Sequence, residues 1–255
     1  MIETLEELAH KEELIIIDGC SIGPIISGKD ESITQMFFYE PFEELINDIF
    51  EITKMVCVGN CVTIPEVINE RKNYFEYINH IKKRFHRQRG KRTFRFERLE
   101  RILTLMKDFH SKLKECVVEY DSVCPYKFNK ILERINIANK IIGFRSEENG
   151  TDEKLVALAI YLAKYYKISP TILTGDYGIV KRLFVYENQL ENSLVEKRPI
   201  KIYSNFVFKK NHCTRRIDLL YDTGHSKEII NSEFEERILR GCPQILRGLS
   251  QSTSK

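Results

Sequence analysis

The sequence has little proline and little glycine, 7 and 12 residues of 255, and it has no long hydrophobic run. Hydrophobic residues make up 42% of the chain and charged residues 30%, which is typical of a globular protein. This composition excludes collagen-like, low-complexity and wholly disordered chains. The longest apolar stretches, 14–17 and 155–163, are far shorter than the roughly 20 residues of a membrane-spanning helix, so we interpret them as core elements.

The N-terminal stretch MIETLEELAHKEEL lacks a basic region followed by an apolar one, so we expect no secretory signal and a cytoplasmic location. The seven cysteines are then expected to be reduced thiols. Cys57 and Cys61 are close in sequence, as are Cys116 and Cys124, but no Cys-x2-Cys or His-x3-5-His pair accompanies them. A structural zinc site is therefore the less favoured alternative.

Positive charge is concentrated in one segment. Residues 82–98 contain nine Lys or Arg and one Glu, a charge of +8, which leaves −5 for the rest of a chain of net charge +3. A basic segment on an acidic body favours a polyanionic partner. The alternative is a solvated helical face, and Phe85, Phe94 and Phe96 either stack on bases or pack against the body. The expected nucleic-acid contacts are Lys82, Lys83, Arg84, Arg87, Arg89, Lys91, Arg92 and Arg95.

Hydrophobic periodicity predicts alternating strands and helices. Strands are expected at 14–17, 61–64, 170–174 and 200–207, with 213–221 as a pairing partner for the last. Helices are expected at 1–13, 41–54, from 65 to about 84, 96–117, 126–142, 151–167 with Thr151 as N-cap, after 178, and at 227–240. This order predicts an α/β fold in which helices flank a central, mostly parallel sheet.

Four acids fall where such a sheet gathers its functional groups, at the carboxyl ends of the strands. Asp18 follows the first strand and Asp176 follows the strand at 170–174, while Glu70 lies one turn into a helix and Asp152 lies in the first turn of another. An acid in such a position is also a common helix N-cap or turn residue, and that alternative stays open for each one alone. As a set, four converging carboxylates would repel one another unless cations neutralise them, and oxygen ligands of this kind select Mg²⁺ or Mn²⁺.

Four sequence blocks carry a resemblance to a known family. LIIIDGCSIG contains Asp18, CVTIPEVINE ends at Glu70, GTDEKLVALAIYLA contains Asp152, and TILTGDYGIVKRL contains Asp176. In this order they resemble the four signature blocks of the PIN-domain nucleases, over about residues 12–185 with an insertion between the second and third.

The resemblance implies a compact Rossmann-like PIN fold carrying a basic helical insertion at about 80–125. It implies that Asp18, Glu70 and Asp152 hold the metal and that Asp176 completes the site. It also implies that Thr174 orients the fourth acid or the substrate, with Ser21 in a supporting part near Asp18.

Four charged residues close in sequence to these acids are expected to have other roles. Glu66 is expected to be a partner of the helix dipole, and Glu153 is expected to face solvent. Lys181 and Arg182 follow Asp176 by about one helical turn and are expected at the rim of the cleft.

These features together predict a divalent-metal-dependent endoribonuclease, which by the resemblance would leave 5′-phosphate and 3′-hydroxyl ends on RNA. The alternative is a PIN-like RNA-binding or scaffold module with weak or no catalysis. A nucleotide-binding α/β domain is disfavoured because the loop at 19–28 fits neither GxGxxG nor GxxxxGK[ST]. We expect a nuclease domain at 1–185, a strand and helix extension at 186–247 and a flexible tail at 248–255. A homodimer or a protein complex stays open.

Overall fold

A five-stranded sheet forms the centre of the fold in a computed structural model that describes residues 2, 4–22, 42–58, 60–87, 93–141, 150–187, 198–209 and 212–225. The strands are β1 (Leu14–Ile17), β2 (Cys61–Val62), β3 (Pro170–Leu173), β4 (Lys201–Lys209) and β5 (His212–Asp222). They run in the order β2-β1-β3-β4-β5, and only β5 is antiparallel to its neighbour. The predicted α/β class with a mostly parallel sheet is therefore confirmed.

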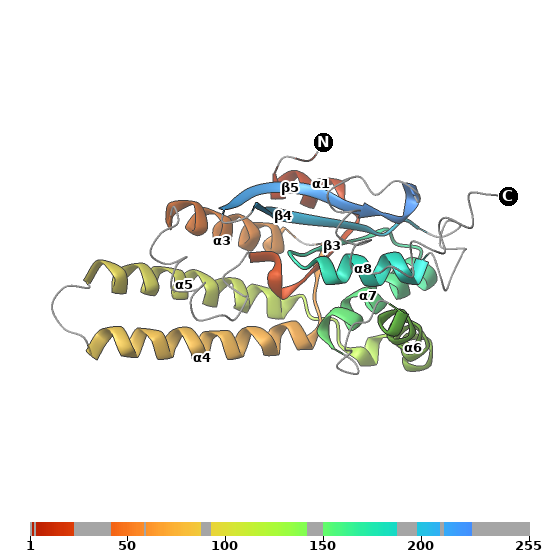
Figure 1. The fold of residues 1–255 in the computed structure, drawn as a ribbon, viewed down its shortest axis with the longest axis horizontal. Coiled ribbons are helices and arrows are strands. Elements are labelled where there is room, and N and C mark those ends of the chain that lie inside the picture. The colour runs from red at the N-terminus through yellow and green to blue at the C-terminus, as the bar shows by residue number, and fades with distance from the viewer. Residues whose placement is uncertain are drawn as a thin grey trace.

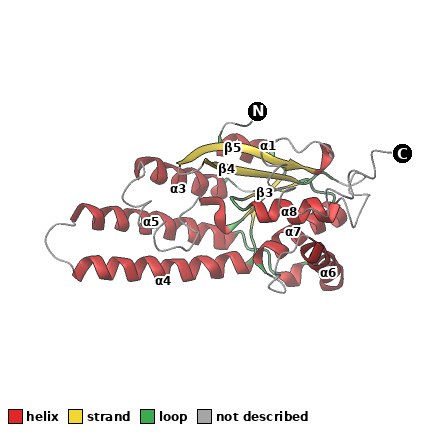
Figure 2. Cartoon of the chain, viewed as in Figure 1, coloured by secondary structure: helices red, strands yellow, loops and turns green. Residues whose placement is uncertain are grey.

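Helices flank this sheet (Figure 2). They are α1 (Leu5–Lys11), α3 (Phe42–Cys57), α4 (Pro65–Arg87), α5 (Thr93–Glu115), α6 (Pro125–Ile141), α7 (Thr151–Tyr161) and α8 (Tyr177–Val185). Short turns η1 (Gly19–Ile22), η3 (Tyr120–Ser122), η4 (Leu162–Tyr166) and η7 (Thr223–His225) complete the described chain. None of the helices in these described ranges is long and apolar enough to cross a membrane.

The expected helix at 151–167 changes its form near its end. The α-helical part stops at Tyr161, and a π-helical turn, η4, continues to Tyr166 before Lys167 adopts a left-handed conformation with φ of 60°. The helix expected at 227–240 and the tail at 248–255 lie outside the described residues.

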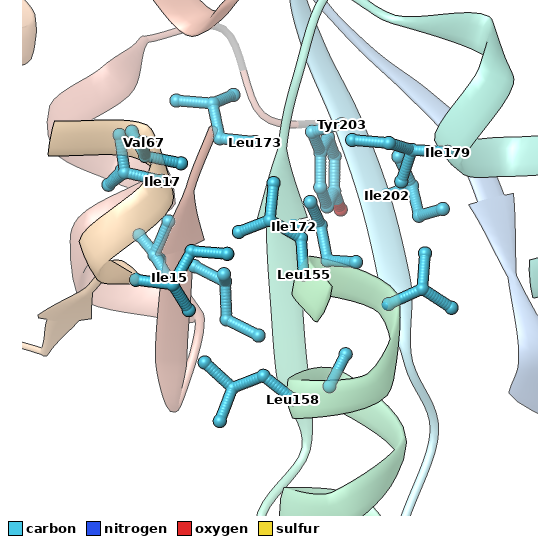
Figure 3. Packing of buried hydrophobic residues seen from close by; sticks show 14 of the residues in the cluster. Ile15, Ile17, Val67, Leu155, Leu158, Ile172, Leu173, Ile179, Ile202 and Tyr203 are labelled. Atoms are coloured by element: carbon cyan, nitrogen blue, oxygen red, sulfur yellow. The ribbon is translucent and has the colours of Figure 1, made fainter. Parts of the chain in front are cut away.

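The core explains why β1, β3 and α7 are nearly continuous apolar runs. Strands covered on both faces need no polar side, and Ile15, Ile16 and Ile17 are fully buried. Helix α7 is buried along its whole length after Lys154, so its residues are apolar all round rather than on one stripe. Figure 3 shows Leu155 and Leu158 of this helix packed near Ile15 and Ile172 of the two central strands.

A long helical hairpin, α4 and α5, which we call the arm, starts before the insertion expected at about 80–125 and includes most of it. Figure 1 shows the two helices side by side, extending away from the sheet. The arm begins and ends at β2: the Thr63 amide donates to the Cys116 carbonyl at 3.0 Å, and the Val118 amide donates to the Thr63 carbonyl at 2.9 Å. Since both ends are fixed at one strand, the arm is an outgrowth from the edge of the sheet.

Candidate active site at the carboxyl edge of the sheet

Strand register brings Asp18 and Thr174 together. Strands β1 and β3 are parallel neighbours with Ile17 opposite Leu173, so the residues that follow them leave the sheet side by side. The Asp18 amide donates to the Leu173 carbonyl at 3.1 Å, and the Thr174 hydroxyl donates to Asp18 Oδ2 at 2.6 Å. Both side chains are buried, so this hydrogen bond fixes the Asp18 carboxylate at the sheet edge.

Thr174 also positions Asp176. Its hydroxyl oxygen accepts a hydrogen bond from the Asp176 amide at 2.8 Å. The Asp176 carboxylate accepts from the Gly178 amide at 2.6 Å and thereby caps the N-terminus of α8. The capping alternative is therefore realised at Asp176, which caps a helix and still lies in the acid group. Thr174 thus makes hydrogen bonds to both Asp18 and Asp176.

Glu70 reaches the same edge from the arm. It lies in the second turn of α4, and a Cβ placed on Gly19, next to Asp18, would be 3.5 Å from Glu70 Oε2. The Thr151 hydroxyl donates to Glu70 Oε1 and so joins α4 to the start of α7. The predicted N-cap at Thr151 is wrong: Gly150 is the N-cap residue and makes no side-chain bond, which leaves the Thr151 hydroxyl for Glu70.

Asp152 forms an ion pair with Arg182, which was expected at the rim of the cleft. Arg182 of α8 lies 3.0 Å from Asp152 Oδ2 through Nη1 and 3.0 Å from Glu153 Oε1 through Nη2. Asn139 of α6 donates to the same Glu153 oxygen at 2.6 Å. The expectations that Glu153 faces solvent and that Arg182 lies at a cleft rim are both wrong, because each is buried in this network. The sequence signal was the spacing that puts Arg182 on the second turn of a helix starting at the sheet edge.

Electrostatics show that the four acids form one group. Burial raises the pKa of Asp18 to about 6, and the negative charges of Asp176 and Glu70 add to the shift, while the Thr174 hydrogen bond opposes it. Burial raises the pKa of Asp152 to about 7, with further contributions from Asp18 and Asp176 and an opposing one from Arg182. Carboxylates that raise one another's pKa values lie close together, and here Arg182 offsets only part of their charge.

The donor set fits a hard divalent cation by its chemistry. It consists of carboxylates with an excess of negative charge, and one oxygen each of Glu70, Asp152 and Asp176 is engaged by the protein contacts above, which leaves a second oxygen for a ligand. Within the described ranges, no three or more His, Cys, Asp and Glu side chains are drawn together tightly enough to enclose an ion. Glu70, Asp152 and Asp176 are instead each engaged by a protein group, namely the Thr151 hydroxyl, the Arg182 guanidinium and the Gly178 amide.

Ser21 and Glu66 also lie near the acid group. Ser21 lies in η1, its amide donates to the Asp18 carbonyl at 3.1 Å, and its buried hydroxyl oxygen has no partner among the described residues. It is therefore one more oxygen at this edge. Glu66 lies in the first turn of α4, as expected for a helix-dipole partner, and it also accepts hydrogen bonds from Lys154 at 2.5 Å and from Tyr120 at 2.6 Å.

The basic residues lie at the far end of the arm. Lys82, Lys83, Arg84 and Arg87 fall on the last turns of α4, and Arg95 falls on the first turn of α5. Arg89, Lys91 and Arg92 lie outside the described residues. Thirteen residues separate Glu70 from Lys83, which is about 20 Å along a helix. The basic segment is thus remote from the acids rather than beside them.

Neither a family model, nor a curated protein, nor a solved structure matches the chain.

Proposed function

We propose that the chain is a PIN-like, divalent-metal-dependent endoribonuclease. The observation that carries the proposal is the convergence of Asp18, Glu70, Asp152 and Asp176, from four separate sequence blocks, on one edge of a parallel sheet. Structural carboxylates are normally dispersed or paired with cations, whereas here burial, together with the charges of neighbouring acids, raises the pKa values of Asp18 and Asp152. Such an arrangement is costly for folding and is typical of a site that takes a cation.

In this proposal Asp18, Glu70 and Asp152 hold Mg²⁺ or Mn²⁺, and Asp176 completes the site. A bound divalent cation there neutralises charge on a phosphodiester and lowers the pKa of a bound water. Thr174 keeps the Asp18 carboxylate in a fixed orientation through its 2.6 Å hydrogen bond. Arg182 keeps Asp152 in place and offsets part of the acid charge until a cation binds.

The arm supplies the grip on RNA in the same proposal. Its basic end lies about 20 Å from Glu70 along α4, which corresponds to about six stacked nucleotides at 3.4 Å each. An RNA chain that contacts both ends must therefore extend along the arm. This geometry favours substrates longer than a few nucleotides over mononucleotides.

The scaffold alternative has one observation in its favour. The Arg182 ion pair with Asp152, at 3.0 Å, already gives one of the acids a protein cation. A module that binds RNA without cleaving it would use such a pair to reduce repulsion permanently. We favour the nuclease because the pKa of Asp152 stays raised to about 7 despite that pair.

The test is incubation of a labelled RNA of mixed structure with the purified protein in Mn²⁺, Mg²⁺ or EDTA. Asp152→Asn is run alongside, with Asp108→Asn as a matched control because Asp108 is an exposed acid on α5. The nuclease predicts metal-dependent cuts that Asp152→Asn abolishes and Asp108→Asn retains. Binding without cleavage under every condition would favour the scaffold, and cleavage retained by Asp152→Asn would defeat the site assignment.

A further inference from the structure

A pocket of about 400 Å³ lies beside the acid group, between η3, α6 and α7. Tyr120 of η3 and Phe128 of α6 form aromatic parts of its wall, with ring centroids 5.4 Å apart. The other lining residues are Val123, Pro125, Asn129, Leu132 and Lys154. This volume is at the lower end of the range for small-ligand sites, so it suits a group of about the size of a nucleotide.

The pocket and the acid group share α7, and a contact with α4 joins them. Lys154 follows Asp152 by two residues on α7, and it is bonded at 2.5 Å to Glu66, which precedes Glu70 by one turn on α4. Side chains four residues apart on a helix have Cβ atoms about 5–6 Å apart. Glu66 and Glu70 are spaced in this way on α4, so the Glu66 carboxylate that contacts the pocket-lining Lys154 lies about one helical turn from Glu70.

The walls favour an uncharged, planar group. The positive charge of Lys154 is matched by Glu66, whose pKa is lowered in spite of burial by its hydrogen bonds with Lys154 and Tyr120. A phosphate would thus meet no excess positive charge here, whereas aromatic and aliphatic walls favour a ring. Asn129 is exposed at the pocket, and its amide offers two donors and one acceptor oxygen, the set that the edge of a nucleobase can pair with.

The pocket is preformed rather than adaptable. The Tyr120 hydroxyl is fixed by its 2.6 Å hydrogen bond to Glu66, and Phe128 is buried with its ring edge-on to Tyr161, centroids 6.1 Å apart. The Tyr161 hydroxyl in turn accepts from the Cys124 amide at 2.8 Å just before α6. Fixed walls lower the cost of ordering side chains when a ligand binds.

We infer that this pocket takes one unpaired nucleobase of the RNA whose backbone passes over the acid group. The inference rests on the proposed function, and it narrows the substrate class to RNA with an unpaired nucleotide beside the phosphodiester that is cut. A base inside a continuous duplex is stacked and paired on its edge, so it cannot enter without being extruded.

The test is a plug. Asn129→Trp places a large ring at an exposed position of the pocket, and Ile137→Trp is the matched control because Ile137 is an exposed, uncharged residue two turns further along α6. Binding of a labelled single-stranded hexaribonucleotide is measured by fluorescence anisotropy in EDTA. We expect Asn129→Trp to weaken binding about tenfold, the effect of losing one stacked base, and Ile137→Trp to leave it unchanged. Equal affinity of Asn129→Trp and the wild type overturns the inference.

Asn129→Ala is a second variant, and it adds no bulk. It tests the inference even if Asn129→Trp disturbs folding, which thermal unfolding of each variant reveals. Loss of the amide is expected to weaken binding several-fold, as for a lost hydrogen bond, and an unchanged affinity for this variant counts against the inference. Because binding is measured in EDTA, it is independent of cleavage. If the wild type cleaves RNA but Asn129→Trp does not weaken binding, only the inference about the base pocket is overturned. If Asn129→Trp weakens binding but no metal supports cleavage, only the nuclease proposal is overturned.

Discussion

Arg182 pairs with one acid of the candidate site and with one buried acid outside it. Its Nη1 lies 3.0 Å from Asp152 Oδ2, and its Nη2 lies 3.0 Å from the buried Glu153. One guanidinium thus serves the site and the core at once. Gly178 leaves room for this arrangement, because a Cβ there would be 2.7 Å from Arg182 Nη1 and 3.0 Å from Asp176 Oδ1.

The first prediction concerns this ion pair. Arg182→Met is expected to lower the free energy of unfolding by about 3–5 kcal/mol, because it leaves a buried carboxylate, Glu153, without its cation. Urea denaturation measures the change. In the double variant Arg182→Met with Glu153→Gln, most of the loss should be recovered, since the fully buried charge is then removed and Asp152, which also loses Arg182, is only partly buried. Additive losses in the double variant would show that Arg182 acts through packing instead.

A second prediction uses divalent cations as ligands of the folded state. Mn²⁺ or Mg²⁺ at 100 times its dissociation constant should raise the free energy of unfolding by about 2.7 kcal/mol. The rise should be lost in Asp18→Asn, which removes a buried, central carboxylate, and kept in Asp108→Asn. Thermal unfolding with and without EDTA gives the answer independently of any nuclease assay. An equal rise in Asp18→Asn would place cation binding elsewhere.

Much of the fold could be predicted because its signals are local. The run at 14–17 is apolar throughout, the run at 170–173 is apolar apart from Thr171, and each is followed by a polar residue at the sheet edge, Asp18 or Thr174. The residues that end adjacent parallel strands must meet, so the convergence of Asp18 with Asp176 followed from topology alone. Helix boundaries in the arm were also close, because a basic stretch containing Gly90 separates two amphipathic runs.

The partners of the acids could not be predicted in the same way. Arg182, Asn139 and Glu153 are each separated by at least 14 residues from one another, and nothing in the local sequence of Asn139 and Glu153 distinguishes them from surface residues. The position of Glu153 depends on how α6 and α8 pack against the first turn of α7. Sequence periodicity says which face of a helix is apolar, but α7 is apolar nearly all round, so it gave no orientation.

A third prediction separates pH effects on folding from effects on the site. Glu187, at the end of α8, is buried and hydrogen-bonded to the Tyr221 hydroxyl of β5, and burial raises its pKa from 4.5 to about 7. The folded protein therefore binds this proton more tightly than the unfolded chain does. Stability from the group is complete below about pH 4.5 and is lost as the pH rises to about 7.

Glu187→Gln should for that reason stabilise the protein at pH 8 relative to the wild type and have little effect at pH 4.5. The expected difference is on the order of 2–3 kcal/mol, since one unit of pKa corresponds to about 1.4 kcal/mol. Chemical denaturation at the two pH values measures it, with Glu133→Gln on the exposed side of α6 as control. The same effect at both pH values would show that the carboxyl stays in one protonation state.

The last prediction concerns the reach of the arm. Replacing Lys83, Arg84, Arg87 and Arg89 by Ala should weaken the binding of RNA of 20 nucleotides or more. It should also reduce the slope of log affinity against log salt by up to about 3, at roughly 0.7 for each phosphate that the variant no longer neutralises. An RNA of three nucleotides, too short to span the distance of about 20 Å from the acids, should bind the variant and the wild type equally when it occupies the acid site.

The matched control for the arm replaces Lys11, Lys54, Lys112 and Lys114, which removes the same charge from positions away from the end of the arm. If both quadruple variants reduce the slope alike, overall charge attracts the RNA and the basic segment is a solvated face. If only the arm variant does so, and only for long RNA, the arm holds the substrate at a distance from the carboxylates.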